Sequence, residues 1–379
     1  MNQNRALKKI TVLGCGLVGS AIAIDLCRDY NVTVADLDYE KLNEVQLNNP
    51  LRIIQSDFLN SNELKRIVND SDLVISAVPG SIGFRILKSL IELNKNVVDI
   101  SFFGEDPFVL SDEAKKRNLT AVIDCGVCPG LSNIILGYHY KRNKITSYKV
   151  YVGGLPKNPL PPFNYKAPFS PSDVIEEYTR PARFVKDGKV ITKEALSDVE
   201  IIEFPEAGKL EAFNTDGLRT LLRTVKIPNM IEKTLRYPGH SALIKAFQDA
   251  GFFSKEKILM NGVEISPIDF ASKLLYKQWK LEKGEKEFTV MKIVIESDSE
   301  TIEYNLYDEY DEKTQTTSMA RTTGYTCTAV ARLMLEKNFC IPGIIAPEII
   351  GEDESNFNFI LDYLKRKNIN PEKNESIGN

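Results

Sequence analysis

The chain has 379 residues, 43% hydrophobic and 26% charged, with a formal net charge of −4, a composition typical of a globular protein with room for two domains. Because it contains no basic block, no apolar N-terminal segment and no apolar run of about 18 residues, we expect no nucleic-acid partner, no signal peptide and no membrane span. Six cysteines without paired metal-ligand spacing predict neither a disulfide framework nor a metal site, which leaves a cytoplasmic protein of enzyme size.

The first predicted elements are a strand, a glycine-rich turn and a helix. An apolar run at residues 9–13 is followed by Gly14, Gly16 and Gly19, and a second apolar run ends at Asp36. Apolar residues recur after the turn at four-residue spacing, as on one face of a helix: Val18, Ile22 and Leu26. This context favours a dinucleotide-binding turn over a glycine-rich turn in another kind of α/β protein.

Each residue type in this turn suits a bound dinucleotide. Gly14 permits the tight turn, Gly16 has no side chain to block a pyrophosphate, and Gly19 lets the helix pack closely against the strand. The N–H groups at the start of the helix would face the anion. Asp36 is placed to accept hydrogen bonds from both ribose hydroxyls and would repel a 2′-phosphate, so the sequence predicts NAD rather than NADP.

Strands and helices continue to alternate through the first third of the chain. The predicted strands are residues 51–55, 73–78, 97–100 and 121–124. The predicted helices are residues 39–47, 61–69, 80–93 and 113–117, and Ser61 is the expected N-cap of the second. This alternation predicts a parallel, doubly wound sheet, in which ligands lie at the carboxyl ends of the strands. The residues expected at that edge are Asp57, Ala77, Pro79, Asp99, Ser101 and Asp124.

Cys125 and Cys128 form a Cys-x-x-Cys pattern just before a predicted helix that reaches about His139. Alone, this pattern is a weak signal for zinc or redox chemistry. We interpret the two cysteines as small buried residues beside a Pro-Gly turn.

The regular alternation ends near the middle of the chain. A strand is predicted at residues 148–153, and the proline-rich loop at 154–171, which contains Lys166, is of a kind that often lies over an active site. Residues 288–296 and 301–310 are predicted as adjacent strands of a half-solvated antiparallel sheet. The residues expected on the buried face of the second strand are Ile302, Tyr304 and Leu306.

The last part of the chain is predicted to be helical. A helix at residues 318–336 would return to the first domain, and the polar tail at 368–379 is expected to be frayed. The sequence thus predicts an α/β protein with three segments: a nucleotide-binding domain at 1–130, an α+β substrate domain at 131–319 and C-terminal helices at 320–379.

Several longer stretches resemble the saccharopine dehydrogenase family, in particular its lysine 6-dehydrogenase branch. They follow the family's order over nearly the whole chain: residues 129–133, 153–156, 165–166, 169–171, 176–183, 212–219, 234–240 and 318–324. The resemblance implies a Rossmann domain, an inserted α+β domain that binds substrate and forms a homodimer, and a C-terminal helical return. It also implies oxidation at a C–N bond, with a hydride passed to a nicotinamide.

The resemblance assigns site residues by their place in the matching motifs. The implied substrate-binding residues are Ser101, Phe102, Tyr178, Thr234, Leu235 and Arg236. The cofactor-binding set is Gly14, Gly16, Leu17, Val18, Gly19, Asp36, Asp57, Ala77, Val78, Pro79 and Cys128. Saccharopine-forming relatives carry Asp where this chain has Cys128, a departure that favours the lysine-dehydrogenase branch.

Oxidation of lysine at its ε-carbon needs a base, because an ammonium group with a pKa of about 10.4 must lose a proton before hydride transfer. The candidates for proton transfer are Asp99, His240 and Lys166. For Asp99 the alternative is a turn role, and for His240, whose ordinary pKa suits proton transfer, it is a helix-capping role.

Charged residues of the matching motifs are candidates for substrate contacts. Arg236 could bind the substrate carboxylate through its forked donors, and the alternative is a surface ion pair. Glu177 and Asp216 could contact ammonium groups, unless they are ordinary exposed carboxylates.

The function predicted first is NAD-dependent oxidative deamination of L-lysine at the ε-carbon, which gives 2-aminoadipate 6-semialdehyde and ammonia. The alternatives are a glutamate-forming saccharopine dehydrogenase, a related carboxy-polyamine dehydrogenase, and, in another class, an NAD(H)-binding sensor without catalysis.

Overall fold

The computed structural model describes residues 7–377 and divides the chain into two units. The first unit extends to Arg142 and also includes Ala320–Ile369, and the second comprises Asn143–Met319 and the chain from Asn370 onward. The first unit therefore continues beyond the predicted boundary at residue 130, through helix α6 (Leu131–Tyr140).

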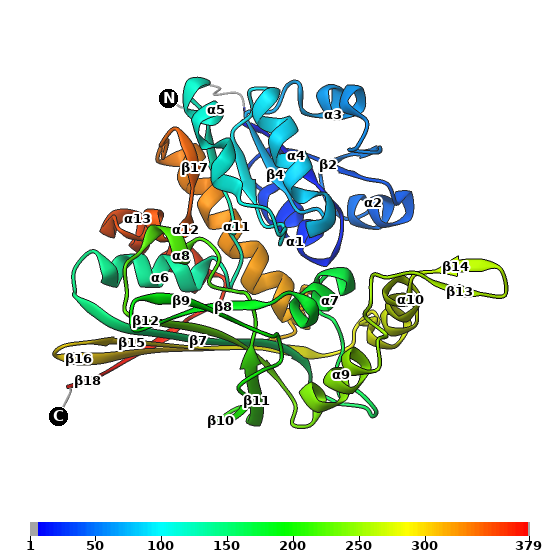
Figure 1. Cartoon of the computed structure of the whole chain (residues 1–379). Helices are drawn as coiled ribbons and strands as arrows, with labels where there is room; N and C mark the ends of the chain where they lie inside the picture. Colours follow the sequence, from blue (N-terminus) through cyan, green and yellow to red (C-terminus); the bar gives the residue numbers. More distant parts are fainter. Residues whose placement is uncertain (1–6, 378–379) are drawn as a thin grey trace. The chain divides into compact units, whose positions relative to one another are not determined.

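The first unit contains a seven-stranded sheet in which every pair of neighbouring strands is parallel. Figure 1 draws the N-terminal part of this unit in blue to cyan-green and its C-terminal part in orange to red. Its strand order is β17-β6-β5-β4-β1-β2-β3. The strands are β1 (Lys9–Leu13), β2 (Asn31–Asp36), β3 (Arg52–Gln55), β4 (Leu73–Ser76), β5 (Val97–Asp99), β6 (Thr120–Val122) and β17 (Gly343–Ile345). The order runs outward from β1 in both directions, so the predicted doubly wound sheet is confirmed, with a ligand crevice expected at the carboxyl end of β1.

The helices between these strands follow the predicted order. They are α1 (Leu17–Leu26), α2 (Tyr39–Gln46), α3 (Ser61–Val68), α4 (Gly80–Glu92) and α5 (Ser111–Lys116), the last preceded by a 3₁₀ turn at Pro107–Leu110. The predicted N-cap of α3 is wrong, because Asn60, not Ser61, accepts hydrogen bonds from the N–H groups of Asn62 and Glu63. Asparagine caps helices as well as serine does, and the cap residue must have extended backbone, as Asn60 has.

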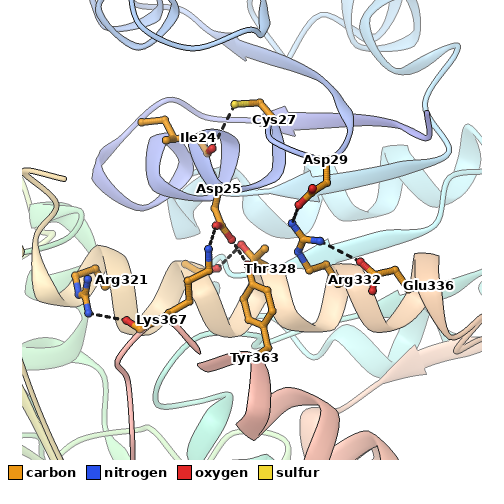
Figure 2. A network of polar contacts seen from close by, with 11 residues as sticks. Ile24, Asp25, Cys27, Asp29, Arg321, Thr328, Arg332, Glu336, Tyr363 and Lys367 are labelled. Atoms are coloured by element: carbon orange, nitrogen blue, oxygen red, sulfur yellow. Dashed lines mark hydrogen bonds and ion pairs between the residues drawn. The ribbon is translucent and has the colours of Figure 1, made fainter. Parts of the chain in front are cut away.

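The C-terminal helices return to the first unit, as predicted. They are α11 (Ser318–Glu336), of which Ala320 onward belongs to this unit, α12 (Pro347–Gly351) and α13 (Glu354–Arg366). Figure 2 shows how polar side chains join α11, α13 and α1. The buried carboxylate of Asp25 in α1 accepts from the Tyr363 hydroxyl and the Lys367 ammonium, while Arg332 of α11 pairs with Asp29.

The second unit is built on a mixed sheet. Its main strand order is β10-β11-β12-β7-β15-β16-β18, and β8 (Ala182–Lys186) and β9 (Lys189–Lys193) branch from β12. The main strands are β7 (Ile145–Pro156), β10 (Glu200–Phe204), β11 (Gly208–Asn214), β12 (Asn229–Arg236), β15 (Glu287–Ser297), β16 (Glu300–Glu309) and β18 (Glu372–Ile377). Only β12 and β7 pair in parallel among these described strands.

Two sequence predictions for this sheet have clear outcomes. The adjacent antiparallel strands are confirmed as β15 and β16, and Ile302, Tyr304 and Leu306 are buried on one face. The expectation of a frayed tail is wrong for β18, whose residues pair with β16 and so satisfy its outer row of backbone hydrogen-bonding groups. Residues 378–379 lie outside the described part of the chain.

Helices and a small hairpin complete the second unit: α7 (Pro171–Thr179), α8 (Leu221–Thr224), α9 (His240–Asp249), β13 (Ile258–Met260), β14 (Val263–Ile265) and α10 (Pro267–Trp279). An apolar cluster between α7, α9 and α10 contains Tyr178, Phe213 and Trp279, which are almost fully buried. Of the helices in residues 7–377, none combines the length and the apolar character needed to cross a membrane.

Candidate functional site

The surroundings of each glycine in the turn after β1 explain why a residue without a side chain suits that position. Gly14 has φ +100°, and a Cβ atom on it would lie 2.3 Å from the carbonyl oxygen of Ala77. A Cβ atom on Gly19 would lie 2.2 Å from the carbonyl oxygen of Gly14, so α1 packs directly on the turn. Gly16, at the N-cap of α1, has nothing within 4 Å of its Cβ position. The open space at a helix N-terminus fits the approach of a phosphate.

Carboxylates lie at the carboxyl ends of the neighbouring strands. Asp36 ends β2, and its carboxylate accepts from the N–H groups of Cys15 (2.6 Å) and Asp38 (2.9 Å). Asp57 follows β3 and accepts from the N–H of Leu59 (2.9 Å). The side chain of Asp36 is therefore fixed against the glycine turn itself, which is where a ribose next to the pyrophosphate would lie.

The other predicted cofactor residues lie on two neighbouring segments. Ala77, Val78 and Pro79 follow β4, and Ala77 donates its N–H to the carbonyl of Leu13 in β1 (2.8 Å). At the start of α1, Leu17 is exposed and Val18 half-buried.

Asp99 ends β5 and is fully buried. Its carboxylate accepts the N–H of Ser101 at 2.7 Å, and its second oxygen lies 3.4 Å from the Ser101 hydroxyl. Burial raises the pKa of Asp99 to about 7. The geometry is that of a side chain holding the turn after β5, the alternative stated for this residue, and Phe102 is half-buried in the same turn.

Cys128 is half-buried beside a cis peptide bond to Pro129, whereas Cys125 is fully buried. Burial, and then the neighbouring Cys125 thiol, raise the pKa of Cys327 in α11 well above its usual value. In the described residues 7–377, no group of three or more His, Cys, Asp or Glu side chains is arranged to hold a metal ion.

In the second unit, Arg236 is the centre of a buried polar network at the end of β12. Its side chain is 3% exposed, and the guanidinium lies 4.3 Å from the centre of the Tyr165 ring. It donates from Nε to the Tyr178 hydroxyl (3.0 Å), from Nη1 to the Leu235 carbonyl (2.9 Å), and from Nη2 to the Tyr165 hydroxyl (3.3 Å) and Glu177 Oε2 (3.1 Å). All of these hydrogen bonds of the guanidinium are made to other groups of the protein.

His240 is the first residue of α9 and extends this network. Its Nδ1 lies 2.9 Å from the Phe163 carbonyl and its Nε2 2.9 Å from the Tyr178 hydroxyl. Because only a donor suits a carbonyl, Nδ1 carries the hydrogen and Nε2 accepts from Tyr178. Burial, and then the nearby Arg236 cation, lower the pKa of His240 to about 3. The expectation of a near-neutral pKa is thus wrong, because a buried imidazole beside a guanidinium stays uncharged.

Glu177 lies at the outer side of the network. Its side chain is 19% exposed. Only Oε2 is bound, to Arg236, and Oε1 makes no hydrogen bond to any residue in the described part of the chain. Burial raises the pKa of Glu177 to about 7, against the opposing effect of Arg236. One carboxylate oxygen is therefore held in place while the other is left for a ligand.

The same face of β12 continues with Thr234 and Glu232, since residues two apart in a strand share a face. The Thr215 hydroxyl lies 2.6 Å from Glu232 Oε2 and 2.8 Å from the Thr234 hydroxyl, and Gly217 donates its N–H to Glu232 Oε2 (3.0 Å). Burial raises the pKa of Glu232 to about 8. This polar row lies on the same face of β12 as Arg236.

Two other predicted residues make different contacts. Lys166 donates to the carbonyl of Lys280 (3.0 Å) and lies 3.8 Å from Glu285, so its ammonium binds the segment that follows α10. Asp216, expected as a possible ammonium ligand or exposed carboxylate, is 3% exposed and pairs with Arg183 at 2.8 Å.

The structure thus brings together Tyr178, Thr234, Arg236 and His240, while the fully buried Leu235 contributes its carbonyl. Sequence reasoning missed Tyr165 and Glu232. The alternation along β12 places residue 232 on the face of Thr234 and Arg236, and this signal could have identified Glu232.

Two family models together match most of the chain. Residues 10–122 match the family model described as saccharopine dehydrogenase NADP binding domain, and residues 126–369 match saccharopine dehydrogenase C-terminal domain.

Curated relatives include the saccharopine dehydrogenase [NADP(+), L-glutamate-forming] of Saccharomyces cerevisiae, 26% identical over 267 residues that cover 66% of this chain and 59% of that protein. The alpha-aminoadipic semialdehyde synthase of Arabidopsis thaliana is 28% identical over 304 residues, which cover 72% of this chain and 28% of that protein. The chain thus spans less than two thirds of the length of these relatives.

Solved structures share the fold over nearly the whole chain. Apo saccharopine dehydrogenase (L-Glu forming) from Saccharomyces cerevisiae has a TM-score of 0.76 at 22% identity, covering 97% of this chain and 100% of that one. Homospermidine synthase from Legionella pneumophila in complex with NAD has a TM-score of 0.68 at 13% identity, covering 98% and 91%.

Proposed function

Because the chain belongs to the saccharopine dehydrogenase family, we propose that it is an oxidoreductase that removes a hydride from a carbon bonded to nitrogen. The proposed substrate is L-lysine, oxidised at its ε-carbon. Hydride loss leaves an iminium, water adds to it, and ammonia leaves to give 2-aminoadipate 6-semialdehyde, which cyclises to piperideine-6-carboxylate. A nicotinamide nucleotide, when bound, supplies the hydride acceptor.

The observation that carries the nucleotide part of this proposal is the glycine turn with its adjoining carboxylate. Gly16 leaves the N-terminus of α1 open for the pyrophosphate, and the backbone of Leu17 and Val18 would donate to it. Asp36 retains lone pairs for two ribose hydroxyls beyond its bonds to Cys15 and Asp38.

The proposed cofactor is NAD, although the matching family model and the yeast relative are named for NADP. A 2′-phosphate at the end of β2 would meet the carboxylate of Asp36 and, two residues on, that of Asp38. The phosphate and these carboxylates are all negatively charged and would repel each other, so NADP would bind more weakly than NAD. Steady-state rates with each nucleotide decide between them.

The second candidate is a glutamate-forming saccharopine dehydrogenase, which the names of the relatives favour. It differs from the first in its products, because it would release glutamate instead of ammonia. The test is incubation of the full chain with lysine or saccharopine and either nucleotide, with reduced nucleotide, ammonia and glutamate all measured. Nucleotide reduction with saccharopine alone would reject lysine. Homodimerisation and a cytoplasmic location remain part of the proposal.

A further inference from the structure

Glu177 combines three properties that no other acid of the buried network shares. One of its oxygens is held by Arg236, its other oxygen is unbound among the described residues, and its side chain reaches the surface of the second unit. We propose that Oε1 of Glu177 binds the substrate's reacting ammonium group and accepts its proton, and that Arg236 positions this carboxylate. This inference rests on the proposed function, whose base it names.

The contacts of Arg236 support a positioning role. Its Nε and Nη1 are held by the Tyr178 hydroxyl and the Leu235 carbonyl, so the plane of the guanidinium is fixed before it meets Glu177. Tyr178 is itself fixed through His240. A base held in this way loses little side-chain entropy when substrate binds.

The charges around Glu177 favour a cationic ligand. From α7, Asp173 and Arg180 act on it, and from β12, Arg236 does so while Glu232 lies close enough for the two carboxylates to affect each other. Tyr165 and Tyr178 are uncharged, because burial raises their pKa values above the usual range, and His240 is neutral. At pH 7 Glu232 is neutral because its pKa is about 8, so Glu177 and Asp173 supply the negative charge that an ammonium group would meet.

The proton transfer is balanced as follows. The N–H bond of the substrate ammonium breaks, and an O–H bond forms on Oε1, which leaves a neutral amine and a neutral carboxylic acid. The lone pair of the neutral amine can then form the C=N bond as the C–H bond breaks, and a bound nicotinamide would accept the hydride. The pKa of Glu177, about 7, is close to the working pH of a general base.

The test compares Glu177→Gln with Glu176→Gln, a matched control on the same helix whose carboxylate pairs with Arg180. Calorimetric titration of the full chain with L-lysine and with L-norleucine, which has no ε-amine, measures the preference for the ammonium group without turnover. The wild type and Glu176→Gln should prefer lysine by about 10-fold or more, and Glu177→Gln should lose this preference. An unchanged preference in Glu177→Gln, or an equal loss in both variants, would overturn the inference.

A second readout is the pH dependence of kcat/KM. The wild type should lose activity as the pH falls through about 7, and Glu177→Gln should lack this limb. Glu177→Asp, which keeps the carboxylate, should restore part of the lysine preference, and thermal unfolding checks that each variant folds. If lysine binding depends on Glu177 but the wild type reduces no nucleotide, the proposed function and the role of Glu177 as a base fail, while its role in binding the ammonium group holds. If the wild type and Glu177→Gln oxidise lysine equally well, the proposed function holds and the inference about Glu177 fails.

Discussion

The contrast between Gly16 and Gly19 offers a sharp test of the nucleotide site, because the same Gly→Ala change should have different effects three residues apart. At Gly16 the added methyl group meets nothing within 4 Å, and φ is −73°, which alanine adopts freely. The free energy of unfolding should therefore change by less than about 1 kcal/mol, since the better entropy of alanine opposes its poorer capping. At Gly19 the methyl would lie 2.2 Å from the Gly14 carbonyl oxygen.

The expected magnitudes follow from these distances. Gly19→Ala must push α1 away from the turn, and overpacking of this kind costs about 1–3 kcal/mol of stability. Gly16→Ala places its methyl where a pyrophosphate would approach. Losing one charge-assisted hydrogen bond to the phosphate, worth roughly 1.5–3 kcal/mol, weakens nucleotide binding by about 10- to 100-fold.

Two measurements on each variant separate these effects. Titration with NADH, followed by its fluorescence, gives the dissociation constant, and urea unfolding gives the stability. The reasoning is refuted if Gly16→Ala binds NADH as tightly as the wild type does, or if it loses as much stability as Gly19→Ala.

Three further predictions concern charged groups. Asp36→Ala should raise the ratio of NADP to NAD in kcat/KM, and an unmoved ratio would mean that this acid does not face the ribose. Asp25→Asn should cost roughly 2–4 kcal/mol in urea unfolding, because it leaves the Lys367 ammonium without its buried partner, whereas Asp29→Asn, at a 56% exposed side chain, should cost less than about 1 kcal/mol. The pKa of Glu232 is raised on folding from 4.5 to about 8, so its contribution is complete below about pH 4.5 and is lost as the pH rises through 8. Glu232→Gln should flatten the fall in stability between pH 5 and 9, and an identical fall in both proteins would contradict the raised pKa.

Local patterns were sufficient to predict the first six strands of the first unit and the helices between them, but not β17, which joins the sheet from a distant part of the chain. The strand–turn–helix signals around Gly14, the buried run of β4 and the ends at Asp36 and Asp99 all depend on residues close in sequence, because strand and helix periods are local properties. The error at the start of α3 is also local. Asparagine and serine are both favoured at helix N-caps, and it is Asn60 that has the extended backbone of a cap residue.

Only the tertiary structure decided the candidate site and the fate of the tail. The polar tail pairs as β18 because the outer edge of β16, some seventy residues earlier, offered unpaired backbone groups. His240 was expected to titrate near neutrality, but Phe163, Tyr178 and Arg236 surround it, and burial is a property of the packed chain rather than of the residue. The sequence by itself therefore determined which residues could bind a nucleotide or carry a charge. Packing determined which carboxylates keep an unbound oxygen and which pKa values shift. Both depend on neighbours that folding brings from distant positions in the chain.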